Sequence, residues 1–330
     1  MNPSSAAPLV FFRVLADRGG KPAGMLLDLG DGDASTLLPL VASEPFAALA
    51  ATFPCMYRPG LAPELAAVLA AHGWSEQQPS ALLRIDGPLL QEQLPPAATW
   101  IDGDWSMAPP ARVQGAQAAS RALALQLVQL VAADADTHAI EALLRHDPTL
   151  SYQLMRLVNS LGMGTGRRIT SFAQAILILG RQQLRRWLNL MLFAARQGDL
   201  RSPMLLARVA VRSRLLELLA KARGLDKQAQ EQAFMTGMFS LLGVLFGMSL
   251  AEVLAPLAIG EAVAGALLAH EGELGALLRL VELAEQGELD TVAEKLAGLQ
   301  LDAEQFNEAV TDAVTWMLGA VLESQGSAHG

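Results

Sequence analysis

The stretch HDPTLSYQLMRLVNSLGMGTGRRITSFAQAILILGRQQLRRWL, residues 146–188, carries the clearest helix signals in the chain. Asp147 can accept hydrogen bonds from the first free amides of a helix, and Pro148 stands at the first helical position, where a missing N–H costs nothing. Apolar residues then recur every three or four positions over residues 150–158, until a run of glycines breaks the pattern. A second helix is expected over residues 170–180. The sequence therefore predicts two consecutive helices that bury one face each.

Basic residues gather in the same part of the chain. Between Arg167 and Arg223 there are twelve basic and two acidic residues, although the whole chain has a net charge of −9. Arginine suits bidentate contacts with carboxylate or phosphate, so this segment could dock an acidic partner protein or ligand. The alternative is a solvated helix surface that pairs with the acidic remainder of the same chain, and the sequence favours this alternative. The candidate binding residues are Arg167, Arg168, Arg181, Arg185, Arg186 and Trp187.

Residues 1–110 have a different pattern. The apolar segments VFFRVLAD and AGMLLDLG flank the turn-prone RGGKP and predict a β-hairpin. Alanine-rich helices are expected near residues 34–51 and 61–72, followed by strands near ALLRIDG and ATWIDG. We therefore expect a small α/β domain over 1–110, a helical domain over 111–323 and a disordered tail over 324–330. The predicted fold class is mainly α, with a C-terminal all-α bundle after the small α/β domain.

Composition sets limits on the setting of the protein. A hydrophobic content of 52% over 330 residues supports a sizeable core, and the single cysteine, Cys55, excludes an intramolecular disulfide and suits a reducing cytoplasm. Residues 233–251 lack formal charge, but glycines interrupt them and no basic bias flanks them, so we expect no membrane span. A pI near 5.1 and 5% aromatic residues argue against nucleic-acid binding.

From about Val113 to Leu322 the chain resembles the HDOD domain, a catalytically silent relative of the HD phosphohydrolases that occurs in bacterial signalling proteins. The resemblance is carried by HDPTLSYQLMRLVNS, ITSFAQAILILGRQQLRRWL and the later segment FMTGMFSLLG. The last two segments resemble the subgroup in which an EAL domain precedes HDOD. The helical half is accordingly expected to be an HD-related bundle.

The metal ligands of an HD enzyme can be checked against this resemblance. Such an enzyme needs histidine and aspartate donors on neighbouring helices. Where the resemblance places the His-Asp pair, this chain has Ser240 and Leu241, and Arg212 stands where an earlier helix would supply a histidine. Neither a guanidinium nor a leucine side chain can ligate a cation. We therefore expect no metal, no other cofactor and no catalysis in this half.

The N-terminal region resembles a shrunken, degenerate EAL domain. In the EAL-HDOD subgroup an EAL domain ends in a G-Y-F-F-x-x-P-like strand, and residues 103–109 occupy the same position here. An EAL phosphodiesterase holds two metals with a cluster of carboxylates and cleaves cyclic di-GMP. No glutamate stands at a suitable strand end, so hydrolysis is not expected.

Together these patterns predict a cytoplasmic, noncatalytic signalling or scaffolding protein that binds a partner protein or an acidic ligand. Two alternatives remain open at this point. One is a cyclic dinucleotide sensor without hydrolysis, using the same arginines. The other is a metal-dependent HD-type phosphohydrolase whose ligands lie elsewhere in the sequence.

Overall fold

The fold is taken from a computed structural model. It describes residues 8–110, 125–130, 132–133, 139–140, 142–143, 186, 188, 193, 199–257 and 259–326, with the side chains of residues 34 and 320–326 left aside. The two helices predicted over residues 146–188 therefore lie almost wholly outside the described residues.

A six-stranded mixed sheet forms the N-terminal half, in the order β4-β3-β2-β1-β6-β5. The predicted hairpin is confirmed, because β1 and β2 pair antiparallel. β6 pairs with β1 in antiparallel orientation. The pairs β2–β3, β3–β4 and β5–β6 are parallel. The strands are β1 Val10–Ala16, β2 Pro22–Leu29, β3 Cys55–Tyr57, β4 Ser75–Glu76, β5 Leu82–Arg84 and β6 Trp100–Asp102.

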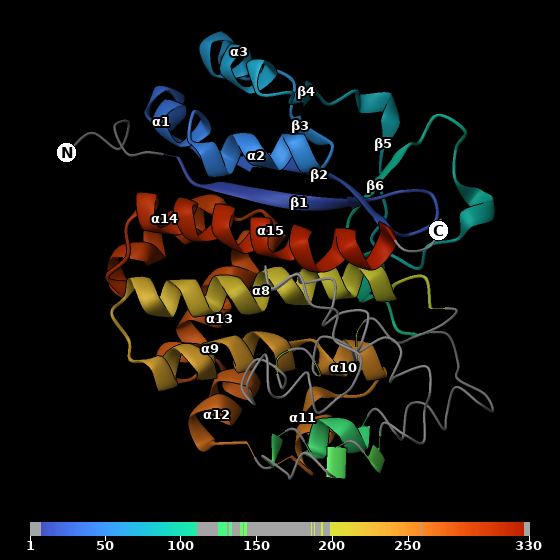
Figure 1. Ribbon diagram of the computed structural model, residues 1–330, viewed down its shortest axis with the longest axis vertical. Helices are drawn as coiled ribbons and strands as arrows, with labels where there is room; N and C mark the ends of the chain where they lie inside the picture. The colour runs from blue at the N-terminus through green and yellow to red at the C-terminus, as the bar shows by residue number, and fades with distance from the viewer. Residues whose placement is uncertain are drawn as a thin grey trace, which may run out of the picture.

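Short helices cover one side of this sheet, as the alanine-rich segments predict. They are α1 Leu38–Val41, α2 Glu44–Thr52 and α3 Pro63–Ala71, and Figure 1 shows α2 next to β1. Phe12 of β1 meets Phe46 of α2 at a ring-centroid distance of 5.6 Å, and Phe46 stacks on Trp74 at 5.1 Å. Such aromatic pairs stabilise beyond their buried area. This contact fixes the helical layer on the sheet.

The second half of the described chain is helical. Its helices are α8 Ser202–Ala222, α9 Lys227–Ser240, α10 Leu242–Phe246, α11 Leu250–Leu254, α12 Glu261–Ala269, α13 Gly272–Gln286, α14 Leu289–Leu296 and α15 Ala303–Gly326. Asp302 accepts from the Gln305 amide at 2.8 Å, which confirms the cap predicted for α15. α15 continues to Gly326, into the segment where a disordered tail is expected.

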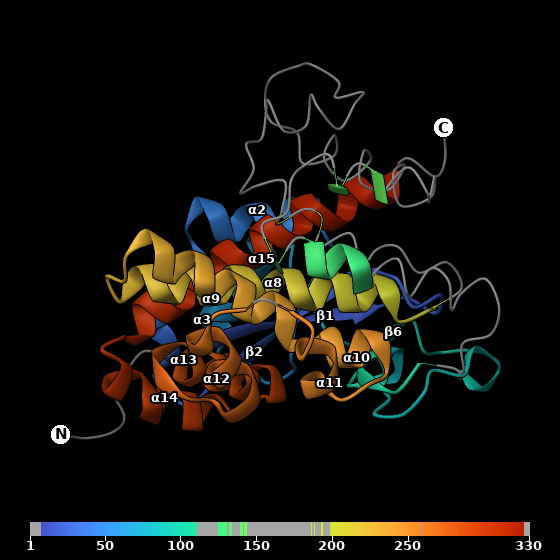
Figure 2. The ribbon, with the colours of Figure 1, turned by 90° about the horizontal axis from the view of Figure 1, so that it is seen from below.

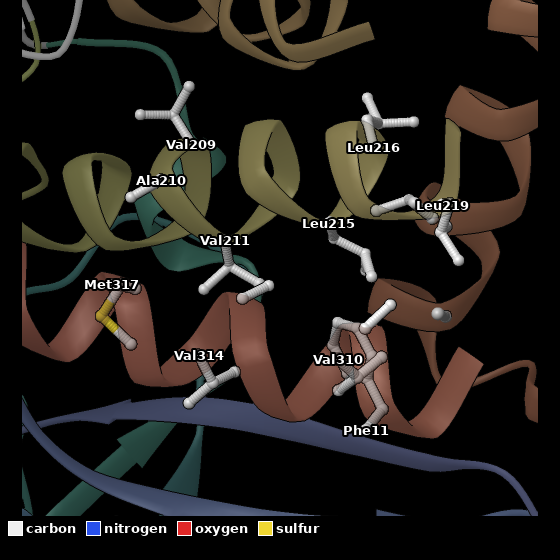
Figure 3. Close-up of a cluster of buried hydrophobic side chains, with 14 of the residues drawn as sticks. Phe11, Val209, Ala210, Val211, Leu215, Leu216, Leu219, Val310, Val314 and Met317 are labelled. Carbon is white, nitrogen blue, oxygen red and sulfur yellow. The ribbon is translucent and has the colours of Figure 1, made fainter. Parts of the chain in front are cut away.

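The C-terminal helix connects the two halves. α15 lies along β1, contacts α2 and also packs against α8 (Figure 1). Figure 3 shows Val211 and Leu215 of α8 directed toward Val314 and Val310 of α15. Asn307 of α15 donates to the Pro8 carbonyl at 3.0 Å and accepts from the Val10 amide at 2.8 Å. The buried amide is thereby satisfied, and α15 holds the start of β1.

The prediction of a mainly α protein with a separate all-α bundle is wrong. The sheet has six strands, and its longest ones are too deeply buried to face water on either side. Phe46 of α2 packs on β1, and α15 contacts both β1 and α2, so a single hydrophobic cluster runs from β1 through α15 to α8 and α9. The fold is therefore a mixed sheet-and-helix architecture. The domain boundary near residue 110 stays a prediction.

The uncharged segment 233–251 does not form one long helix. It is divided among α9, α10 and the start of α11, and Gly247 ends α10 in the left-handed conformation at φ 61°. Within the described part of the chain, no helix combines the length and apolar character that crossing a bilayer requires.

The crossing of α8 and α9 yields a first prediction. The two helices lie along each other (Figure 2), and a Cβ at Gly237 would stand 2.5 Å from the Cα of Ser213. Alanine favours a helix over glycine by about 1 kcal/mol, but the backbone of α8 cannot move aside easily. We expect Gly237→Ala to lower the free energy of unfolding by about 1–3 kcal/mol in a urea titration.

The matched control is Gly298→Ala, since no atom lies within 4 Å of the added Cβ there. It should change the free energy of unfolding by less than about 0.5 kcal/mol. Equal stability of both variants would show that α8 and α9 do not approach this closely.

Candidate functional site

The arginines of the basic segment pair within the chain wherever the structure describes them. Six are described, and each forms an ion pair with an aspartate or glutamate. They are Arg186, Arg201, Arg208, Arg212, Arg214 and Arg223. For these residues the second interpretation of the charge pattern, pairing with acidic residues of the same chain, describes the geometry. The other candidate binding residues, Arg167, Arg168, Arg181, Arg185 and Trp187, lie outside the described residues.

Arg186 lies in a nearly closed site between α8 and α9. Its side chain is 11% exposed, donates to Glu217 at 2.8 Å and binds Glu231 through its Nε and Nη2 atoms. The guanidinium lies 4.2 Å from the centre of the Phe234 ring. Burial opposes its charge, but the hydrogen bonds that it donates to Glu231 and Glu217 outweigh this effect and raise the pKa of Arg186. Arg186 therefore stabilises contacts inside the protein.

A second cluster surrounds Glu285 of α13, whose side chain is 7% exposed. Arg212 of α8 binds it in a bidentate manner, from Nε to Oε1 at 2.7 Å and from Nη2 to Oε2 at 2.6 Å. Arg208, one helical turn earlier, donates to Oε2 at 2.7 Å and to Asp104 at 2.7 Å. We call Arg208, Arg212, Glu285 and Asp104 the Glu285 cluster.

Pairing with the two arginines lowers the pKa of Glu285. Burial alone would raise the pKa, but the charges and hydrogen bonds of Arg212 and Arg208 lower it to about 2. Burial likewise opposes the charge of Arg208, whereas Glu285 and Asp104 raise its pKa. Glu285 and Arg208 are therefore charged at neutral pH, and the buried Glu285 joins both arginines in one network of ion pairs.

Two of the three degenerate HD positions meet in this cluster. Arg212 donates from Nη1 to the hydroxyl of Ser240 at 2.8 Å, and that hydroxyl donates to the Gly237 carbonyl at 2.7 Å. Leu241 is 1% exposed and belongs to the hydrophobic core. The structure thus brings Arg212 and Ser240 together and adds Glu285. Their correspondence to HD metal positions stays a prediction.

A pocket of about 200 Å³ opens beside the Glu285 cluster, between β1, β6, α8 and α13. Its polar lining includes Asp102 and Ser106, which sequence patterns did not single out. Asp102 ends the segment TWID. A charged residue at the end of an apolar strand was the one sequence signal that could have marked Asp102 as a site residue. Glu285 was missed as well, because its arginine partners lie 73 and 77 positions earlier in the chain.

The buried Glu285 yields a prediction about pH. The pKa of Glu285 is lower in the folded than in the unfolded state, so its stabilising contribution is complete above about pH 4.5 and is lost as the pH falls toward about 2. We expect Glu285→Gln to lower the free energy of unfolding at pH 7 by about 3–5 kcal/mol, because two arginines lose their partner. The variant should also lose part of the acid sensitivity, as measured by urea titrations from pH 7 to pH 2.5.

Glu308→Gln, at an exposed position of α15, is the matched control. It should keep both the stability and the pH profile of the parent chain. A Glu285→Gln protein as stable as this control would contradict the ion-pair network.

Comparison with known proteins shows where this chain has relatives. Residues 119–264 match the family model of the HDOD domain. The protein YuxH of Bacillus subtilis strain 168, of uncharacterised function, is 31% identical over 175 residues, which are 52% of this chain and 42% of YuxH. Cyclic di-GMP phosphodiesterase CdgJ of Vibrio cholerae is 32% identical over 196 residues, which are 59% of this chain and 45% of CdgJ. The chain thus spans less than half the length of either relative.

A crystal structure from Shewanella amazonensis SB2B, provisionally named a phosphohydrolase, has a TM-score of 0.45 and 17% identity to this chain. The structural match covers 61% of this chain and 93% of the Shewanella chain. This degree of likeness is too low to assign a fold. The family match is the firmer result. From it we conclude that the chain contains an HDOD domain over residues 119–264.

Proposed function

We propose that this chain is a noncatalytic regulatory protein whose HDOD domain binds a partner protein or an acidic ligand. The observation that carries the proposal is the bidentate pairing of Arg212 with Glu285, together with the hydrogen bond from Arg212 to Ser240. By the resemblance to HD enzymes, Arg212 and Ser240 stand where metal donors are expected. The cluster therefore contains a fixed organic cation at the place of a metal ion.

Electrostatics supports the same conclusion. A divalent cation at this place would have to displace a guanidinium from a buried carboxylate that already accepts bonds on both oxygens. Breaking such a buried pair leaves an uncompensated charge, which costs about 3–5 kcal/mol. Arg208, held by Glu285 and Asp104, would also repel the incoming ion. These costs favour binding and regulation over metal-dependent hydrolysis.

The phosphodiesterase name of CdgJ is the observation that favours the rival functions. It suggests hydrolysis of a phosphodiester, or recognition of cyclic di-GMP without hydrolysis. Neither follows from the shared segment alone, because that segment covers 45% of CdgJ. The two rivals differ in what they require: hydrolysis needs a metal or another catalytic group, whereas a sensor needs a saturable nucleotide site.

The first test of this function is a search for turnover. The purified full chain, incubated with Mn²⁺, Mg²⁺ or Zn²⁺ and then desalted, should hold well under one metal ion per chain by plasma mass spectrometry. It should hydrolyse neither bis(p-nitrophenyl) phosphate nor cyclic di-GMP above the buffer rate. One bound metal per chain with turnover lost in Ser240→Ala would establish an enzyme instead. Saturable heat with cyclic di-GMP in calorimetry, lost in Arg185→Glu, would establish the sensor.

The second test concerns the partner. The double variant Arg181→Glu/Arg185→Glu reverses two charges in the basic segment, and Arg279→Glu/Lys295→Glu reverses two at exposed positions of α13 and α14 as a matched control. After cross-linking in native cells, mass spectrometry should show a partner that the control keeps and the first variant loses. Purified together, that partner and the parent chain should bind at least tenfold more tightly than the partner and the first variant. The same partners for all three chains would overturn a docking role of these arginines.

A further inference from the structure

The pocket beside the Glu285 cluster is built from both halves of the chain. β1 and the end of β6 contribute one wall, and α8 and α13 contribute the other. Its apolar lining residues are Phe11, Phe12, Val14, Met204 and Val211. A volume of about 200 Å³ is well above the roughly 30 Å³ of one water molecule. It is below the roughly 300–1,000 Å³ of pockets that hold drug-sized ligands, so the occupant must be small.

Two polar side chains in this lining make no hydrogen bond to a described residue. Asp102 is 7% exposed, and its nearest cation is Nη1 of Arg13 at 4.0 Å, beyond hydrogen-bond distance. Ser106 is 3% exposed, and no described group bonds its hydroxyl. No side-chain oxygen of Asp102 or Ser106 is among the fully enclosed, unpartnered polar atoms of the described chain, so both groups are open to the pocket. A carboxylate in such a place gains from a hydrogen-bond donor that the pocket can hold.

The arginines nearby are already committed to other carboxylates. Arg13 donates through Nε to Asp28, and Arg208 binds Glu285 and Asp104. Arg208 cannot turn to Asp102 without leaving Glu285, and Arg13 keeps its Nε on Asp28 while its Nη1 stays 4.0 Å from Asp102. A ligand that carries an ammonium group would supply hydrogen bonds to both Asp102 and Ser106.

Arg84 supplies a second charge in the lining of the pocket. Arg84 of β5 is the cross-strand neighbour of Asp102 in the parallel β5–β6 pair, and neighbouring strands lie about 5 Å apart. The Arg84 side chain is 55% exposed, and its ion pair is with the exposed Asp86 two residues later. An exposed pair of this kind contributes at most about 1 kcal/mol. Arg84 can therefore exchange Asp86 for an anionic group on a ligand.

We propose that this pocket binds a small zwitterion of amino-acid size, with its ammonium group on Asp102 and Ser106 and its carboxylate on Arg84. Opposite charges on adjacent strands suit a molecule with both charges on a short skeleton. Phe11 and Met204 would cover the apolar part of such a molecule. The proposal is independent of the noncatalytic role, because the pocket would bind its ligand whether or not the chain hydrolyses a phosphodiester.

The test uses the full chain and the twenty proteinogenic L-amino acids as probes, screened by saturation-transfer NMR and measured by calorimetry. At least one amino acid should bind saturably. Asp102→Asn should weaken its binding at least tenfold, and Asp312→Asn, at an exposed position of α15, should leave it unchanged. Circular dichroism and thermal unfolding check that both variants fold.

Arg84→Gln separates the two charges, and its exposed position puts folding at little risk. It should weaken the binding of the amino acid at least tenfold and change the weaker binding of the corresponding decarboxylated amine by less than twofold. Ser106→Ala should weaken both probes several-fold, and it replaces Asp102→Asn if that variant fails to fold. Absence of binding by every amino acid, or affinities that Asp102→Asn and Ser106→Ala leave unchanged, would overturn the proposal.

Discussion

The buried carboxylate of Glu285 constrains the whole arrangement of the helices around the sheet. A charge that is 7% exposed must be paired, and the chain pairs it with two arginines one turn apart on α8. Arg208 extends the network to Asp104, just after β6, and Arg212 extends it to Ser240 at the end of α9. Segments from both halves of the chain are thereby fixed to one another. Apolar packing would tolerate small shifts between them, but bidentate hydrogen bonds allow few geometries.

This constraint also explains the charge pattern of the chain. A basic segment inside an acidic protein suggests an external partner, yet the described arginines of that segment find their partners on α8, α9 and α13 or in nearby loops. Arg186 shows the extent of this internal pairing, because two glutamates and the face of Phe234 surround it. The electrostatic asymmetry of the sequence is in large part an asymmetry between elements that pack together.

Local signals in the sequence predicted local structure well. The β1–β2 hairpin follows from two apolar segments around a turn, and the cap at Asp302 follows from one side chain and one amide. The fold class did not follow, because it depends on which helix covers the sheet, and α15 is about 300 residues away from β1. The Glu285 cluster was hidden for the same reason. Arg212 and Ser240 were singled out through the family resemblance, but no local sequence pattern links either of them to Glu285. No pattern marked Asp102 and Ser106 as two lining residues of one pocket.

The pocket and the Glu285 cluster share Asp104, Arg208 and Glu285, and both cross the limits of the HDOD match. Met204, Arg208 and Val211 lie inside residues 119–264, whereas Asp102, Ser106 and Glu285 lie outside them. An HDOD segment without the sheet and α13 would keep two buried arginines on α8 and lose their carboxylates. Because uncompensated buried charge is strongly destabilising, α8 requires residues on both sides of the matched segment. The sheet is thus part of the electrostatic environment in which this HDOD domain folds.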